Sequence, residues 1–210
     1  MTTAIIGVGN IGKTVAGYLT SGGERVVLAA RDESNAKALA NQLGEMASAT
    51  SVEKAIADAD VVVFAVWLDT MKTLVAQHAD ELRGKVVVDP SNPIRLDDNG
   101  GFVRTLPDGQ SAGSIIAGLL PPDAHYVKAF GTLGADLLAS EANRAPRAVL
   151  FYATNDDQAA TAIERLISAA GFEPVKAGGV DAALRIEALG GLSGRVFDAS
   201  EARAMVAAAA

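Results

Sequence analysis

The stretch Ala4-Ile5-Ile6-Gly7-Val8-Gly9-Asn10-Ile11-Gly12 decides the fold of this chain. An apolar run of strand type leads into a G-x-G-x-x-G turn, and a helical pattern over residues 10–20 follows. In such a turn Gly7 allows a tight bend, Gly9 lets the backbone approach a pyrophosphate, and Gly12 permits close helix–strand packing. Because free N–H groups at the start of a helix attract phosphate oxygens, the stretch predicts a dinucleotide-binding unit.

Along the rest of the chain, short apolar runs alternate with longer helical patterns. Strands are predicted at residues 4–6, 26–30, 61–66, 86–88, 127–130, 148–153 and 173–175. Helices are predicted at residues 10–20, 34–43, 69–82 and 156–170. Uninterrupted apolar runs suit strands covered on both faces, and strand–helix–strand repeats form right-handed crossovers. The pattern predicts an α/β fold of the Rossmann type, with a doubly wound, mostly parallel sheet and a C-terminal helical segment.

We expect a single domain over residues 1–210, with a dinucleotide-binding Rossmann core at 1–155 and a C-terminal extension at 156–210. Residues 89–113 are rich in proline and glycine, which predicts a long loop at the ligand-binding edge of the sheet. Three glycines within residues 190–194 predict either close approach of another backbone or of a ligand, or a helix break. The flanking Arg185 and Arg195 are expected to meet an anionic substrate or to pair with nearby acidic residues, Glu187 or Asp198.

Composition excludes several functional classes. The chain has 18 Lys and Arg against 25 Asp and Glu, a net charge of -7, and no basic cluster of the kind that nucleic-acid binding needs. The absence of cysteine and the presence of only two histidines exclude a thiol nucleophile and predict no metal site. No apolar run reaches the ~18–20 residues of a membrane span, and a strand beginning at Thr3 leaves no room for a targeting segment. We therefore expect a cytoplasmic protein with neither a nucleic acid nor a membrane as its partner.

The end of the second predicted strand indicates which dinucleotide is bound. An NAD site carries an acidic residue at this place, whereas here the strand ends in Arg31, whose guanidinium suits the 2′-phosphate of NADP. Ser34 and Asn35 offer further hydrogen bonds at the start of the next helix. Asp32 leaves two roles open, since its carboxylate serves either a ribose or the start of that helix. We predict NADP(H) as the cofactor.

Six segments carry a resemblance to known enzymes: residues 6–12, Arg31, residues 62–67, 87–93, 127–134 and 171–175. The D-x-S-N-P and K-A-F-x-T motifs among them are more specific than the glycine turn. Over nearly its whole length the chain resembles the NADP-dependent oxidoreductases that use the deazaflavin coenzyme F420. It is also similar to the NADPH-binding domains of pyrroline-carboxylate reductases and of the six-transmembrane metalloreductases.

This resemblance implies where the cofactor lies. The whole turn, with Val8, Asn10 and Ile11 beside its glycines, would face the phosphates. The nicotinamide side would be lined by Ala65, Val66, Trp67, Asn92, Pro93, Ala129 and Phe130. Residues 156–210 would complete the substrate pocket, and the chain would form a homodimer. Where the family commonly has Asn, this chain has Gly131, which leaves the second substrate open. Trp67 is expected either to wall the pocket or to pack beneath the following helix.

We expect an NADP(H)-dependent oxidoreductase that transfers a hydride between NADPH and a flat small-molecule acceptor, with a deazaflavin favoured and a flavin possible in its place. Transfer between stacked rings needs positioning and exclusion of water, and we predict no catalytic acid, base or nucleophile. An imine or carbonyl reductase would need a proton donor, for which Tyr126, Asp89 and His125 are the candidates. A flavin or metal reductase, and an NADPH-binding sensor without turnover, remain alternatives. Asp89 is expected to orient the turn that follows it or to cap its strand.

Overall fold

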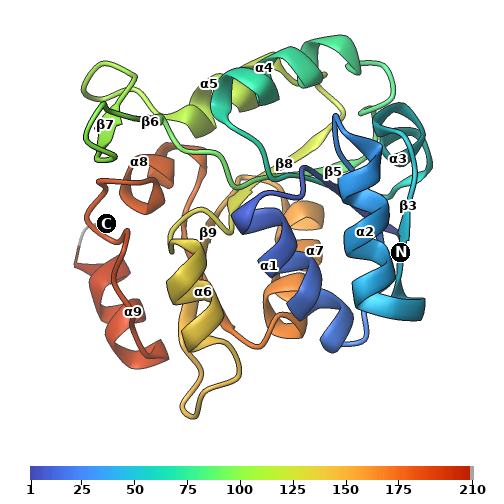
Figure 1. Cartoon of the computed structure of the whole chain (residues 1–210). Helices are drawn as coiled ribbons and strands as arrows, with labels where there is room; N and C mark the ends of the chain where they lie inside the picture. The colour runs from blue at the N-terminus through green and yellow to red at the C-terminus, as the bar shows by residue number, and fades with distance from the viewer. Residues whose placement is uncertain (209–210) are drawn as a thin grey trace.

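One central sheet organises the computed structural model, which describes residues 1–208 and leaves Ala209 and Ala210, the end of the predicted extension, outside the described residues (Figure 1). The strand order is β10-β9-β8-β5-β4-β1-β2-β3, and every pairing is parallel except that of β8 with β9. These strands are β1 Thr3–Ile6, β2 Val26–Ala29, β3 Ala47–Ala49, β4 Val61–Phe64, β5 Val86–Asp89, β8 His125–Ala129, β9 Val149–Ala153 and β10 Glu173–Gly178. The predicted doubly wound, mostly parallel sheet is confirmed.

Helices cover both faces of the sheet because successive strand residues point to opposite sides. Val61 and Val63 join the core cluster beneath α1, α2, α6 and α7, whereas Val62 and Phe64 pack with α3, α4 and α5. The helices are α1 Asn10–Ser21, α2 Glu33–Leu43, α3 Val52–Asp58, α4 Leu68–Gln77, α5 Ala112–Leu119, α6 Ala135–Glu141, α7 Asp157–Ala169, α8 Ala183–Ile186 and α9 Ala199–Ala207. Figure 1 shows α4 and α5 above the sheet and α1, α2, α6 and α7 below it.

The predicted loop at residues 89–113 is only partly a loop. It contains an antiparallel hairpin, β6 Ile94–Leu96 with β7 Phe102–Arg104, and α5 begins before its end. The Asp97 carboxylate accepts hydrogen bonds from the backbone of Asn99 and Gly101, so it closes the hairpin turn. The strands are three residues long, too short for their alternation to stand out among proline and glycine.

Other differences arise at the ends of elements. The strand predicted over residues 61–66 ends at Phe64, and the helix predicted over 69–82 ends at Gln77. Short elements, β3, α3, α5 and α6, were not predicted. The C-terminal helical segment consists of α8 and α9 separated by irregular residues 187–198. Within this stretch a Cβ at Gly190 would lie 2.3 Å from the Leu184 carbonyl oxygen, a close backbone approach, whereas a Cβ at Gly191 or Gly194 would meet no atom within 4 Å.

Candidate functional site

The predicted site residues gather at one edge of the sheet, which we call the carboxyl edge. The turn 7–12 follows β1, Arg31 follows β2, and residues 65–67 follow β4. Residues 90–93 follow β5, and residues 130–132 follow β8. Because these five strands are mutually parallel, their carboxyl ends all open onto this edge. The strand order turns back at β1, between β2 and β4, which is where doubly wound sheets form their binding crevice.

The glycine turn has the geometry that its sequence predicts. Gly7 has φ +100°, and its N–H donates to the Ala29 carbonyl oxygen at 2.8 Å. A Cβ at Gly12 would lie 2.0 Å from the Gly7 carbonyl oxygen, so only glycine lets α1 begin this close to β1. Gly9 is exposed, and a Cβ there would meet no atom within 4 Å. The open side of Gly9 is the side from which a diphosphate can approach the backbone.

The start of α1 differs from the starts of α2, α3 and α7. Those three helices carry a capping side chain that accepts a backbone N–H, from Asp32, Ser51 and Asp156. At α1 the N-cap residue is Gly9, with no side-chain cap and no acidic residue in the first turn. Its first N–H groups and the positive end of the helix dipole are therefore available to an anion. These features fit the diphosphate of a dinucleotide.

The end of β2 presents Arg31 as an exposed side chain. Asp32 is the N-cap of α2, where its carboxylate accepts hydrogen bonds from the Ser34 N–H at 2.9 Å and the Ser34 hydroxyl at 2.6 Å. The Ser34 side-chain hydrogen bond, followed by that of its backbone, lowers the pKa of Asp32, so this carboxylate stays ionised at neutral pH. Because the Ser34 hydroxyl donates its one hydrogen to Asp32, it cannot donate to a phosphate in this arrangement.

A hollow of about 410 Å³ lies between the glycine turn and α2. Its lining residues are Val8, Gly9, Lys13, Asn35, Ala38, Leu39 and Gln42. Lys13 is exposed and was missed by sequence reasoning, although a basic residue directly after the last glycine was a visible signal. A larger hollow of about 850 Å³ opens at the opposite edge of the sheet and is lined by none of the predicted site residues.

The residues predicted for the nicotinamide side lie at the ends of β4, β5 and β8. Trp67 is 55% exposed at the N-cap of α4, so it does not pack beneath that helix. Ala129 and Phe130 are buried, and Phe130 has φ +62°. The chain then turns so tightly that a Cβ at Gly131 would lie 2.4 Å from the Pro90 carbonyl oxygen. The glycine at this position therefore follows from contact between two backbones.

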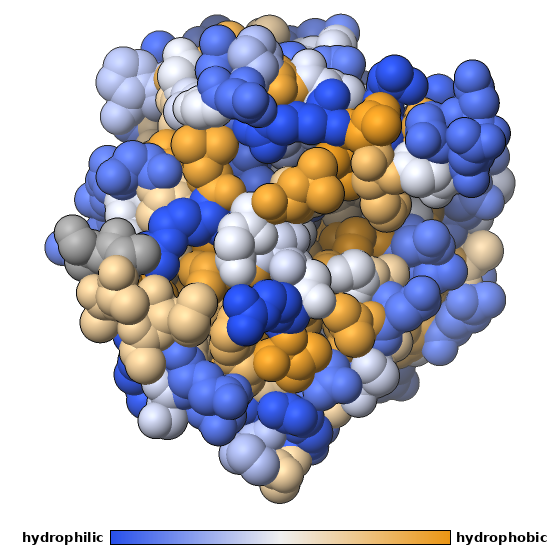
Figure 2. Space-filling view, turned by 90° about the vertical axis from the view of Figure 1, so that its left-hand side faces the viewer, coloured by the Kyte–Doolittle hydropathy of each residue, from blue (hydrophilic) through white to orange (hydrophobic). Residues whose placement is uncertain are grey.

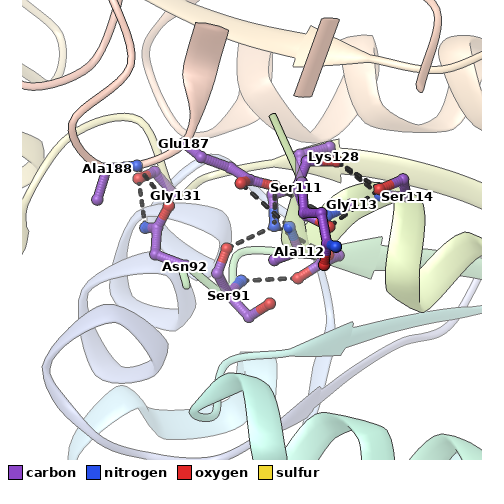
Figure 3. Close-up of polar contacts among 12 residues, drawn as sticks. Ser91, Asn92, Ser111, Ala112, Gly113, Ser114, Lys128, Gly131, Glu187 and Ala188 are labelled. Carbon is purple, nitrogen blue, oxygen red and sulfur yellow. Dashed lines mark hydrogen bonds and ion pairs between the residues drawn. The ribbon is translucent and has the colours of Figure 1, made fainter. Parts of the chain in front are cut away.

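Asn92 joins three segments that are distant in sequence (Figure 3). Its amide nitrogen donates to the Gly131 carbonyl oxygen at 2.9 Å, and its amide oxygen accepts the Ala188 N–H at 2.7 Å. The side chain thus ties the ends of β5 and β8 to the C-terminal segment. One amide hydrogen of Asn92 is left for another acceptor.

Sequence reasoning missed a buried charged cluster beside Asn92. The Lys128 ammonium group lies 2.9 Å from Asp89 Oδ2 and 3.5 Å from Glu187 Oε1. Asp89 accepts the Ser91 N–H, as expected for a residue that orients the following turn. The alternative in which the two arginines pair with Glu187 or Asp198 is not found: Arg185 donates to the Met205 carbonyl oxygen, and Arg195 lies over the Phe197 ring.

Two of the three candidate proton donors, Tyr126 and His125, are not placed to donate a proton at the carboxyl edge. The Tyr126 hydroxyl is buried and donates to Asp89 at 2.8 Å. Burial, and then the charge of Asp89, raise the pKa of the Tyr126 phenol well above its ordinary value, which makes it a poorer acid. His125 begins β8 at the opposite edge, where its Nδ1 lies 2.8 Å from Asp156 Oδ2.

The fold and the glycine turn define a dinucleotide-binding α/β protein of the Rossmann type. Residues 2–93 match the family described as NADP oxidoreductase, coenzyme F420-dependent, so over this range the chain is similar to that family of NADP-dependent enzymes. Within residues 1–208 we find no cluster of metal-ligating side chains and no helix long and apolar enough to cross a membrane.

Known proteins share more of the chain than this family model does. An F420-dependent NADP reductase of Methanothermobacter thermautotrophicus is 27% identical over 89% of this chain and 85% of its own length. The metalloreductase STEAP3 of Rattus norvegicus is 29% identical over 88% of this chain, which spans only 35% of that protein. A hypothetical protein from Sinorhizobium meliloti, known by its crystal structure, is 31% identical with a TM-score of 0.83, over 94% of this chain and 95% of that one.

Proposed function

We propose that the chain is an NADPH-dependent reductase that transfers a hydride to a flat ring acceptor, with a deazaflavin of the coenzyme F420 type as the favoured one. The observation that carries the cofactor half of this proposal is the glycine turn, which leaves the start of α1 uncapped and the side of Gly9 open. The family match to NADP oxidoreductases supports the same reading.

The chain's own residues bind and orient the cofactor in this proposal. Backbone N–H groups of the turn, Gly7 to Gly12 with Val8, Asn10 and Ile11, hold the diphosphate. Arg31 pairs with the 2′-phosphate. Lys13 and Asn35 line the hollow between the glycine turn and α2. Ser34 can bind the phosphate only after its hydrogen bond to Asp32 breaks. The nicotinamide side is formed by Ala65, Val66, Trp67, Asn92, Pro93, Ala129 and Phe130. When bound, NADPH supplies the hydride from its nicotinamide ring.

The acceptor is proposed to be a planar ring because the protein offers little for proton transfer. Tyr126 and Asp89 are buried and bonded to each other, and His125 lies at the far edge of the sheet. Ring-to-ring hydride transfer requires alignment and exclusion of water, which buried Phe130 and the nearby C-terminal segment are placed to provide. Figure 2 shows apolar residues bordering a hollow on the face that carries this segment.

A flavin or metal reductase is the second candidate, favoured by the 29% identity to a metalloreductase over 88% of this chain. An imine or carbonyl reductase is less compatible with the occupied proton donors. A sensor that binds NADPH without turnover would use the same glycine turn. The expected homodimer remains a prediction, and sedimentation velocity would measure the oligomeric state directly.

The test is oxidation of NADPH, followed at 340 nm, with a panel of acceptors: a deazaflavin, FMN, a ferric chelate and a cyclic imine. We expect the deazaflavin to give the highest kcat/KM. Faster turnover with the ferric chelate or with the imine would replace the proposed acceptor. Tight NADPH binding without oxidation by any acceptor would instead favour the sensor.

A further inference from the structure

A buried ionic cluster lies directly beneath the carboxyl edge, and the proposed hydride transfer gives it no role. Lys128 is 2% exposed, and Asp89 and Glu187 are fully buried. The Lys128 ammonium group stands between the two carboxylates and also donates to the Ser91 carbonyl oxygen (Figure 3). One cation therefore faces two buried carboxylates that come from different parts of the chain.

Glu187 is anchored on its other side by α5. Its two carboxylate oxygens accept the backbone N–H groups of Ala112 at 3.1 Å and Gly113 at 2.8 Å. Gly113 makes this approach possible, because a Cβ there would lie 2.6 Å from the Ala183 Cβ of α8. The start of α5 adds partial positive charge that offsets part of the second carboxylate. The position of Glu187 is thus fixed relative to both β8 and α5.

A buried ion cluster of this kind is weak support for stability, since well-packed apolar residues often serve as well. Its effect here is geometric. Directly after Glu187, the Ala188 N–H donates to Asn92, and the Gly194 N–H donates to the Thr132 carbonyl oxygen at 2.8 Å. Residues 187–194, which contain no helix or strand, are therefore pinned to the residues that follow β5 and β8.

Leu189 lies between these attachment points and shows the strain that they impose. It has φ +70°, a conformation unfavourable for a leucine, and its side chain is 68% exposed. Strained backbone persists only where the surroundings hold it, and it gathers at ligand sites. The attachments hold this strained, exposed apolar residue beside Asn92, at the nicotinamide side of the edge.

We propose that Lys128 and Glu187 are positioning residues that hold segment 187–194 over the carboxyl edge, so that the segment covers the nicotinamide half of NADPH and forms one wall of the acceptor pocket. The identity of the ligand in this inference rests on the proposed function. The adenosine half, at the glycine turn and Arg31, does not touch the cluster and is independent of it.

The variant Glu187→Gln tests this inference, because it removes one of the two negative charges that face Lys128 while keeping the size of the side chain. We expect the Kd of NADPH to rise about tenfold, while the Kd of 2′,5′-ADP, which represents the adenosine half alone, changes less than about twofold. In the free protein, hydrogen exchange of the Ala188 and Gly194 amides is expected to accelerate at least about tenfold.

Lys128→Met is expected to shift the same measurements in the same direction, and Glu187→Gln carries the test if Lys128→Met does not fold. Lys85→Met is the matched control, because Lys85 donates to the Ala57 and Ala59 carbonyl oxygens at the opposite edge of the sheet. It should leave both dissociation constants and both amide exchange rates unchanged.

Equal losses of affinity for NADPH and 2′,5′-ADP in Glu187→Gln would overturn the inference, and so would unchanged exchange at Ala188 and Gly194. If the unsubstituted chain binds neither ligand, the proposed function fails. The exchange rates of the free protein then still decide whether the cluster holds the segment.

Discussion

The two halves of the carboxyl edge are built in different ways. The half proposed to hold the adenosine of the cofactor, here called the adenosine half, runs from β1 to α2 and is local: glycines shape its turn, and Arg31 stands exposed beside it. The nicotinamide half depends on hydrogen bonds between distant residues, such as Asn92 with Ala188, 96 positions apart. A short sequence motif is enough to specify the local half. The geometry of the half built from long-range contacts, in contrast, depends on the sequences of several segments, and a change in any one of them alters it.

This difference separates recognition of the cofactor from the choice of the hydride acceptor. The family match covers residues 2–93, which include the whole adenosine half but only the β4 and β5 parts of the nicotinamide half. Recognition of the cofactor therefore follows from the shared motif. We propose that the choice of acceptor depends on residues after β8 and on the C-terminal segment, which lie beyond that match.

The largest effect is expected for Gly12→Ala in the local half. Its Cβ would lie 2.0 Å from a backbone oxygen, which cannot move without shifting β1. We expect a loss of about 3 kcal/mol in the free energy of unfolding, measured by urea denaturation, together with loss of NADPH binding.

Gly9→Ala is the matched control, because the space beside Gly9 is open within the protein. It should leave the unfolding free energy within about 0.5 kcal/mol and still weaken NADPH binding, because the methyl group occupies the place proposed for the diphosphate. Unchanged NADPH affinity in this variant would argue against the turn as the phosphate site.

A smaller effect is expected for Gly131→Ala in the nicotinamide half. The added methyl group would press on the Pro90 carbonyl oxygen and separate β5 from β8. We expect a loss of about 2 kcal/mol in unfolding free energy and weaker binding of NADPH, but not of 2′,5′-ADP. Gly134→Ala, which meets no atom within 4 Å, is the control, and equal destabilisation by both variants would contradict the reason given.

Arg31→Ala tests the specificity of the local half. Loss of a charge-assisted hydrogen bond to the 2′-phosphate is expected to raise the Kd of NADPH about tenfold and to leave that of NADH nearly unchanged. Fluorescence titration with both dinucleotides measures the two constants. Equal losses would show that Arg31 does not read the phosphate.

The smallest effect is expected at the far edge, for Asp156→Ala. Asp156 caps α7, and its loss should lower the unfolding free energy by about 1 kcal/mol at pH 7. Burial acts to raise the pKa of Asp156, but hydrogen bonds from Ala159 and His125 outweigh it and hold that pKa below 3.8. The stabilisation by ionised Asp156 is therefore present above pH 3.8 and is lost as the pH falls through the lowered pKa.

Asp156→Asn, which keeps a capping oxygen, should lose less stability than Asp156→Ala. Both variants should bind NADPH with normal affinity, because His125 and Asp156 lie away from the carboxyl edge. A loss of turnover that tracks this pair would return His125 to the list of proton donors.

Much of the fold could be predicted because its signals are local. Runs such as 61–64 and 86–88 are apolar on both faces, and Asp156 marks the start of α7 by its own hydrogen bond. The hairpin at residues 94–104 and β3 escaped prediction because three-residue strands show no periodicity. The Ser51 cap was a signal for α3 that could have been used.

The nicotinamide half was predictable only through resemblance. Nothing near Lys128 in the sequence indicates that it meets Glu187, since their contact depends on how α8 packs on α5. Glu187 was expected to pair with an arginine of its own segment, and the structure places it at the start of α5 instead. Buried polar partners that are distant in sequence leave no periodic pattern.

A crystal structure of the chain with NADP⁺ tests the central claim most directly, because it shows both halves of the carboxyl edge at once. We predict the diphosphate against the glycine turn, the 2′-phosphate beside Arg31, and the nicotinamide ring between Asn92 and Phe130, beneath segment 187–194. A dinucleotide bound in the hollow at the opposite edge, or a nicotinamide ring that projects away from Asn92 into solvent, would contradict it.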